Sequence, residues 1–250
     1  VRNIDAVNQK IHTDIGDLNY DYLVIATGST TNFFKFSKEV SGKMMQMKDI
    51  PQALNLRSFI LENFEEALLT YDESKKEELI NISIVGGGPT GVELAGALGE
   101  MRKNILPKDY PEIDFTKMQI HLFESGDRLL GAMHPENSAK VLKYVKDFGV
   151  EVWLNTMVTD FDGDVLTTAD GKKVKCETLI WTAGVKGNPV EGFAPETIAG
   201  GNRISVDEYC KIKGYENIYA IGDVASMVQE KYPKGHPMVA PVAIQQGELV

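Results

Sequence analysis

The stretch Ile82–Glu93, which reads ISIVGGGPTGVE, decides the fold of this chain. A short apolar run is followed by the pattern Gly-x-Gly-x-x-Gly at Gly86, Gly88 and Gly91. That pattern predicts a buried strand, a tight turn and the start of a helix, an arrangement in which the helix N-terminus holds a dinucleotide pyrophosphate. The alternative is a glycine-rich strand-to-helix turn that binds no ligand. No Lys-Ser or Lys-Thr pair follows the glycines, which excludes a P-loop.

The glycine pattern lies in mid-chain, with roughly eighty residues ahead of it, whereas such patterns usually open a domain near an N-terminus. The chain begins with Val1 inside a strand-like segment and ends at Val250 in a helical pattern without a capping residue. We therefore expect an internal piece of a longer protein.

Composition limits the classes of function. With 250 residues and 43% hydrophobic content, the chain can bury a substantial core in one or two domains. A formal charge of -10 argues against nucleic acid as a partner. No apolar run approaches the ~18 residues that span a bilayer. Cys176 and Cys210 are far apart and the four histidines show no metal spacing, so neither a local redox disulfide nor a metal site is expected.

Hydrophobic periodicity predicts an α/β protein. Antiparallel strands are expected within residues 1–25, with a turn at 14–19, and a helix over about 51–71 precedes a charged stretch at 72–78. Strands and helices alternate after residue 80, which indicates a parallel sheet. The expected elements are helices at 91–103 and 135–148, strands at 119–123, 150–154 and 178–181, and a hairpin at 161–175.

Glu124 ends the strand that follows the glycine helix. A carboxylate at this position can accept a hydrogen bond from an adenosine ribose 2′-hydroxyl and would repel a 2′-phosphate, which favours NAD over NADP. Glu124 follows Gly86 by 38 residues, a longer spacing than usual, because of a proline-containing insert at 104–117. Arg128 is the nearby residue that could instead contact a phosphate.

Three further strand ends carry small residues and glycine. Residues 21–28 (DYLVIATG) and 177–184 (ETLIWTAG) resemble each other and bracket the glycine pattern, although each alone could be an ordinary buried strand. Residues 218–225 (IYAIGDVA) form a second strand-turn-helix signature. There Asp223 could hold a ribityl hydroxyl, with backbone N–H groups at the helix start for pyrophosphate, or could simply cap the helix.

The order of these motifs resembles the two-dinucleotide-binding flavoproteins, in which an NAD(P)H domain is inserted into an FAD domain. The closer similarity is to the type II NADH:quinone oxidoreductases. It implies an α/β fold with a Rossmann-like three-layer NADH domain inserted into an incomplete FAD-binding domain. The implied boundaries are 1–48 and 186–250 for the FAD-domain segments and 49–185 for the NADH-binding domain. The segments on which this resemblance is based are YLVIATGS (22–29), VGGGPTGVELAG (85–96), LIWTAGV (179–185) and APVAIQQG (240–247).

The resemblance also implies roles for individual residues. Glu93 would lie where nicotinamide meets flavin, and Gln245 would lie beside the isoalloxazine ring, so both are candidate catalytic residues. Without the resemblance, Glu93 needs no function, since a helix N-terminus favours a carboxylate. Pro241 departs from the family pattern, which has its first glutamine there. The implied cofactor-binding residues are Thr27, Gly28, Gly222 and Asp223 for FAD, and Gly86, Gly88, Pro89, Thr90, Gly91, Glu124 and Gly184 for NADH.

The implied reaction passes a hydride from NADH to FAD and then two electrons to a quinone. The family's first glycine pattern, which binds the FAD pyrophosphate, should precede Val1, so the chain is expected to bind NADH without retaining FAD. A module that binds NADH without turnover is therefore an alternative, as is a sulfide:quinone or disulfide-type oxidoreductase, which needs reactive cysteines. The intact protein is expected to be cytoplasmic, on the inner face of the cell membrane through parts outside this chain, and is a possible homodimer.

Overall fold

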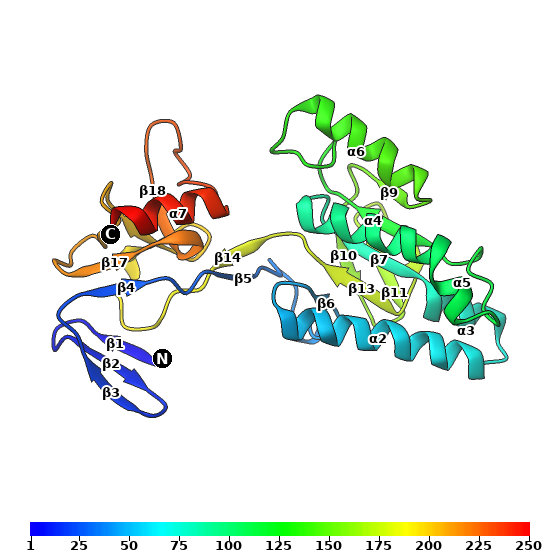
Figure 1. Ribbon diagram of the computed structural model, residues 1–250, viewed down its shortest axis with the longest axis horizontal. Helices are drawn as coiled ribbons and strands as arrows, with labels where there is room; N and C mark the ends of the chain where they lie inside the picture. The colour runs from blue at the N-terminus through cyan, green and yellow to red at the C-terminus, as the bar shows by residue number, and fades with distance from the viewer. The chain divides into compact units, whose positions relative to one another are not determined.

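The computed structural model describes residues 1–250, which form two compact units (Figure 1). Unit 1 comprises Val1–Asn32 and Val185–Val250, and unit 2 comprises Phe33–Gly184. Unit 2 is therefore inserted in the sequence of unit 1. No helix is both long enough and apolar enough to cross a membrane.

A five-stranded parallel sheet forms the centre of unit 2, in the order β6-β13-β7-β8-β9. All residues of the three central strands are buried, as expected for parallel strands covered on both faces. Val85 pairs with both Phe123 and Trp181, so the chain leaves these three strands at one level. The strands are β6 (Met45–Gln46), β13 (Thr178–Trp181), β7 (Ile82–Val85), β8 (Ile120–Phe123) and β9 (Glu151–Trp153).

Helices cover one face of this sheet. Ile82 and Ile84 of β7 share a core cluster with Phe64 of α2 and Leu98 of α4, and α6 contributes Val145 to the same cluster. Pro89 at the first position of α4 supplies a preset φ where no N–H is required. The helices of unit 2 are α1 (Lys38–Ser41), α2 (Ile50–Leu69), α3 (Glu73–Ile80), α4 (Pro89–Asn104), α5 (Leu106–Asp109) and α6 (Pro135–Asp147).

An antiparallel sheet of three strands covers the other face. It comprises β10 (Val158–Phe161), β11 (Val165–Thr168) and β12 (Lys173–Lys175). Phe161 and Leu166 pack in a second core cluster with Val85 and Trp181, which alternate along their strands with the residues of the helix-facing cluster. Unit 2 thus has three layers, helices on a parallel sheet on an antiparallel sheet, which confirms the predicted fold class.

Unit 1 consists mainly of short strands around a smaller core that includes Ile4, Ile25, Ile204 and Ile218. Two of its strands, β4 and β17, pair in parallel and end together, because Ile25 pairs with Ala220. The elements are β1 (Asn3–Asp5), β2 (Lys10–Thr13), β3 (Gly16–Asn19), β4 (Leu23–Ile25), β5 (Ser29–Thr31), β14 (Val185–Gly187), η1 (Pro195–Thr197), β15 (Ile198–Ala199), β16 (Arg203–Val206), β17 (Ile218–Ala220), η2 (Gly222–Val224), β18 (Ala225–Met227) and α7 (Ala240–Leu249).

Several expected elements differ from the structure. The predicted turn at 14–19 is wrong after Ile15, because residues 16–19 form β3, which pairs with β2. The charged stretch 72–78 begins a helix, since Asp72 accepts hydrogen bonds from the amides of Ser74 and Lys75. Gly222–Val224 form a single 3-10 turn that runs into β18, so no helix starts there.

The first boundary between the units also lies earlier in the chain than expected. Residues 33–48, which were expected in the FAD-domain segment, belong to unit 2. They add β6 to the edge of the parallel sheet and pack Phe33 and Phe36 against Trp181, with ring centroids 6.0 and 5.1 Å away. Nothing in their polar and aromatic sequence signals a two-residue edge strand.

Candidate functional site

The glycine turn lies between β7 and α4, and two of its glycines are needed because backbone segments meet closely. Gly86 has φ +114°, and a Cβ on it would lie 2.8 Å from the backbone of Ala183. A Cβ on Gly91 would lie 1.9 Å from the carbonyl oxygen of Gly86. These positions therefore exclude side chains for reasons of folding alone.

Gly88 is different, because a Cβ at this residue would meet nothing within 4 Å. It is the N-cap of α4 and offers no side chain to the helix. Pro89 and Thr90, which follow it, are exposed. The N-terminus of a 16-residue helix is thus open, with its positive dipole end and first-turn N–H groups available to an anion. This space fits a pyrophosphate.

Glu124 lies at the end of β8, beside the glycine turn. Its Oε2 accepts a hydrogen bond from the amide of Gly87 at 2.7 Å, and its Oε1 accepts one from the amide of Gly126 at 2.6 Å. The hydroxyl of Ser125 also donates to Oε1, at 3.3 Å. A carboxylate has about four acceptor positions, so Oε2 can accept a further bond from a hydroxyl. Arg128 donates to the carbonyl of Gly131 at 2.7 Å, within its own loop.

The end of β13 lies on the other side of the glycine turn. The hydroxyl of Thr182 is 2.9 Å from the carbonyl oxygen of Val85 and 3.2 Å from that of Gly86, so it ties the two strand ends together. Gly184 follows with φ +116° and is exposed. Glu93 is exposed on α4 and makes no ion pair. The predicted NADH residues of unit 2 therefore gather along one edge of its sheet.

In unit 1, the residues predicted to bind FAD gather at the ends of β4 and β17. Thr27 donates its hydroxyl proton to the carbonyl of Asn188 at 2.6 Å, and Gly28 has φ +68° with open space beside its Cα. Ser29 donates to Oδ2 of Asp223 at 2.6 Å, which orients this carboxylate. The paired strands thus bring Gly28 and Asp223 to one place.

The turn at Gly222 depends on a residue that the sequence analysis missed. The amide of Gly222, with φ +71°, donates to Oε1 of Gln246 at 2.7 Å. Gln246 is only 5% exposed, and its Nε2 has no partner. Gln245, the predicted residue, is exposed. Ala243 faces Gly222 and lies three residues before Gln246, so helical spacing could have indicated the buried glutamine.

Arg203 of β16 is a second missed residue in unit 1. It is buried and donates to the carbonyl of Ala225, while its Nε has no partner. Burial lowers the pKa of this guanidinium, and the negative charge of Asp223 acts in the opposite direction. A buried cation therefore faces the turn that carries Asp223.

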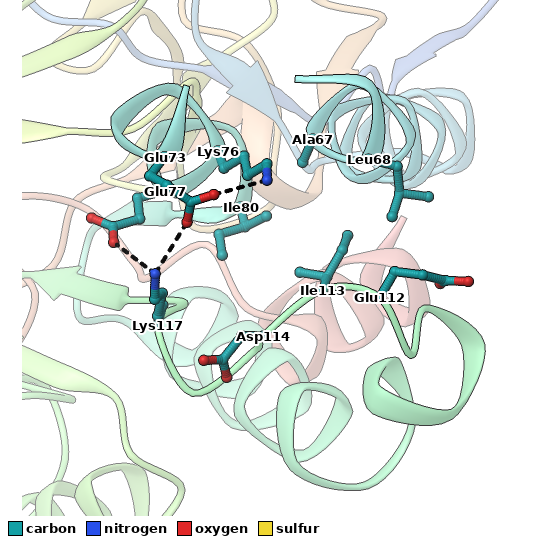
Figure 2. A pocket seen from close by; sticks show the side chains of 10 residues that line it. All are labelled: Ala67, Leu68, Glu73, Lys76, Glu77, Ile80, Glu112, Ile113, Asp114 and Lys117. Carbon is teal, nitrogen blue, oxygen red and sulfur yellow. Dashed lines mark hydrogen bonds and ion pairs between the residues drawn. The ribbon is translucent and has the colours of Figure 1, made fainter. Parts of the chain in front are cut away.

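Two cavities of unit 2 lie away from this edge. One of about 220 Å³ lies among α2, α3 and the loop at 112–117 (Figure 2). Lys117 reaches between Glu73 and Glu77 there, at 3.2 and 3.8 Å, so the polar side chains of this cavity largely pair with one another. The glycine turn is instead an open edge, which suits a long ligand lying across several strand ends.

The glycine turn of unit 2 lies at the carboxyl ends of parallel strands, with a helix N-terminus and a carboxylate beside it. This arrangement is that of the Rossmann-like dinucleotide-binding fold. Comparison with known protein families supports this fold over almost the whole chain. The chain belongs to the pyridine nucleotide-disulphide oxidoreductase family, whose model matches residues 1–247.

Named relatives are also similar. The type II NADH:quinone oxidoreductase of Haemophilus influenzae is 38% identical over 84% of this chain, and the mitochondrial external alternative NAD(P)H-ubiquinone oxidoreductase B3 of Arabidopsis thaliana is 33% identical over 92% of it. The structure of NDH2 from Plasmodium falciparum in complex with NADH superposes on 90% of the chain with a TM-score of 0.81 and 26% identity. The chain covers 50%, 40% and 49% of these proteins, respectively, so it spans about half their length or less.

Proposed function

We propose that this chain supplies the NADH-binding unit and part of the FAD-binding unit of an NADH:quinone oxidoreductase. The observation that carries the proposal is the open N-terminus of α4 at Gly88, with the Glu124 carboxylate beside it. The names of the relatives support the reaction, and the Plasmodium structure in complex with NADH supports the ligand.

In unit 2, the proposed ligand is NADH lying across the ends of β8, β7 and β13. The N–H groups at the start of α4 would hold the pyrophosphate, because they lack side-chain acceptors. Glu124 would accept hydrogen bonds from the adenosine ribose while its other bonds hold the turn. A 2′-phosphate at this position would face that carboxylate, so NADPH should bind more weakly.

In unit 1, the residues fit a flavin dinucleotide in two respects. Gly28 leaves open space at the end of β4, and the buried Nε2 of Gln246 lacks a partner beside Gly222. Asp223 and the Gly222 turn would hold FAD here. When bound, FAD would supply the redox chemistry that takes a hydride from NADH and returns two electrons to a quinone. The protein would contribute alignment and electrostatics.

Two exposed residues, one in each unit, are proposed to take part in the reaction. Glu93 lies on α4, near the helix end that would hold the cofactor, and presents its carboxylate to solvent. Gln245 on α7 has an exposed amide that can both donate to and accept from a quinone. Pro241 of the same helix has no N–H to offer.

Disulfide-type chemistry has little support here. Cys176 and Cys210 are both buried free thiols in different units. Burial raises the pKa of Cys176 to about 12, so this thiol does not provide a nucleophilic thiolate. The better-supported second candidate is an NADH-binding module without turnover, because the chain spans about half the length of its relatives.

A combined titration tests both candidates. The purified 250-residue chain is titrated with NADH by calorimetry, its visible flavin spectrum is recorded, and NADH oxidation is followed with a soluble quinone. NADH binding with bound flavin and quinone reduction supports the full proposal. Binding of NADH alone supports the module. Failure to bind NADH would overturn the proposal.

A further inference from the structure

Phe34 is an exposed aromatic residue whose backbone is held in an unusual conformation. The chain carries three phenylalanines close together, Phe33, Phe34 and Phe36. Phe33 and Phe36 pack partly buried against Trp181, whereas Phe34 is 66% exposed. Its φ of +50° lies in the left-handed region, which bulky residues rarely adopt. Such outliers gather at ligand-binding sites, so Phe34 is a candidate for a functional contact.

The ring of Phe34 lies over Gly184. A Cβ on Gly184 would come within 3.1 Å of Cζ and 3.5 Å of Cε2 of this ring. The ring also stands edge-on to Trp181, with centroids 6.4 Å apart and planes at 66°. All three residues belong to unit 2. The exposed aromatic surface is therefore fixed at the end of β13.

The order of the strands determines which part of a bound dinucleotide would lie next to Phe34 and Gly184. Going along the edge, Glu124 follows β8, the glycine turn follows β7, and Thr182 leads to Gly184 after β13. Neighbouring strands lie about 4.8 Å apart, so the ends of β8 and β13 are separated by roughly 10 Å. A dinucleotide with its adenosine ribose at Glu124 and its pyrophosphate at Gly88 would extend its nicotinamide end over Gly184.

We propose that Phe34 is a positioning residue that covers one face of the nicotinamide ring of NADH. This inference rests on the proposed NADH site. An aromatic ring stacks on a planar heterocycle in offset or edge-on geometry, and the Phe34 ring, which is 66% exposed, leaves surface for that contact. The strained backbone at Phe34 presents the ring at the sheet edge instead of burying it against Trp181 with Phe33 and Phe36. The other face of the nicotinamide would stay available to a hydride acceptor.

The test compares NADH with ADP-ribose, which has the same adenosine and pyrophosphate but no nicotinamide. Both ligands are titrated by calorimetry into the wild-type chain and into Phe34→Ala, Phe34→Tyr and, as a matched control, Tyr71→Ala. Tyr71 is an exposed aromatic residue of the same unit, 99% accessible. Phe34→Ala should weaken NADH binding about threefold to tenfold and leave ADP-ribose binding unchanged, as expected for one lost aromatic contact. Phe34→Tyr should restore NADH binding, and Tyr71→Ala should change neither ligand.

The remaining outcomes contradict the inference in distinguishable ways. Equal weakening of both ligands by Phe34→Ala would give Phe34 a role in the architecture of the site and overturn its nicotinamide role. Unchanged binding of both ligands would also overturn the nicotinamide role of Phe34. If the wild-type chain binds neither ligand, the proposed function itself is wrong. Circular dichroism of each variant checks that the fold is retained.

Discussion

The carboxylate of Glu124 is hydrogen-bonded to the backbone of the glycine turn, with 2.7 Å between its Oε2 and the amide nitrogen of Gly87. The end of β8 is thereby fixed to the turn that follows β7. The side chain in position to recognise a ribose is thus also part of the structure that would hold the pyrophosphate. Substitutions at Glu124 should therefore affect both stability and binding. Neighbouring residues that have only one of these roles allow the two effects to be measured separately.

Gly88 and Gly91 separate binding from folding. Gly91→Ala should destabilise unit 2 by about 3 kcal/mol or more, because its Cβ would overlap the carbonyl of Gly86. Gly88→Ala should change the unfolding free energy by no more than about 0.5 kcal/mol, because its methyl group enters open space and its φ is -75°. The same methyl group should weaken NADH binding at least about tenfold, since it blocks close approach of the pyrophosphate.

Denaturant unfolding and calorimetric NADH titration of the two variants measure these effects. Gly96→Ala is the matched control, because its Cβ also meets nothing within 4 Å but lies on α4 beyond the turn. It should leave NADH binding unchanged and add up to about 1 kcal/mol of stability. Equal NADH affinity for Gly88→Ala and Gly96→Ala would argue against a pyrophosphate at the helix N-terminus.

The adjacent glutamines of α7 should behave in opposite ways. Gln246→Leu leaves the amide of Gly222 without its acceptor and should cost about 1–3 kcal/mol of unit 1 stability. Gln245→Leu removes an exposed side chain and should cost less than about 0.5 kcal/mol. Thermal unfolding distinguishes them, and amide hydrogen exchange at Gly222 should accelerate only in Gln246→Leu. Similar destabilisation by both substitutions would contradict the assigned contacts.

His121 should make the stability of unit 2 dependent on pH. Its Nδ1 accepts from Nε1 of Trp153 at 3.2 Å, and its Nε2 lies 3.2 Å from Oε1 of Gln119, a pairing that suits the neutral ring. Burial lowers the pKa of His121, while Glu151 acts in the opposite direction. Below about pH 6.5 the unfolded chain therefore binds a proton more readily than the folded one, and stability falls as pH falls.

Urea unfolding between about pH 8 and pH 5.5 measures this dependence. His121→Gln should remove most of it. The control is His134→Asn, since His134 caps α6 and asparagine retains capping ability. A pH dependence that survives in His121→Gln would show that His121 is not the group responsible.

Much of unit 2 follows from local sequence patterns, because its signals are strong and continuous. The apolar runs of β7, β8 and β13 identify buried parallel strands, and the glycine pattern fixes where α4 starts. Asp72 is an N-cap residue, yet the charged stretch after it did not predict a helix, because the buried residues of α3 are only Leu79 and Ile80. A helix with so little apolar surface lacks the periodicity that predicts one.

Unit 1 is harder to predict, since its turns depend on contacts between distant segments. Ser29 and Asp223 meet because β4 pairs with β17, across almost two hundred residues of sequence. Gln246 could not be distinguished from Gln245 by residue type, and only the helix face decides which of the two is buried. The placement of Phe34 over Gly184 likewise depends on a contact between segments at opposite ends of the sequence of unit 2, which no local pattern encodes.

The most direct test of the central claim is a calorimetric titration of the 250-residue chain with NADH and NADPH, in the wild type and in Glu124→Arg. The wild type should bind NADH at least about tenfold more tightly than NADPH, because the proposed Glu124 contact accepts from a ribose hydroxyl and repels a 2′-phosphate. Glu124→Arg should weaken NADH binding and remove or reverse this preference. Equal affinity of the wild-type chain for both cofactors would contradict the proposed ribose contact of Glu124, and no binding of either would contradict the proposed NADH site.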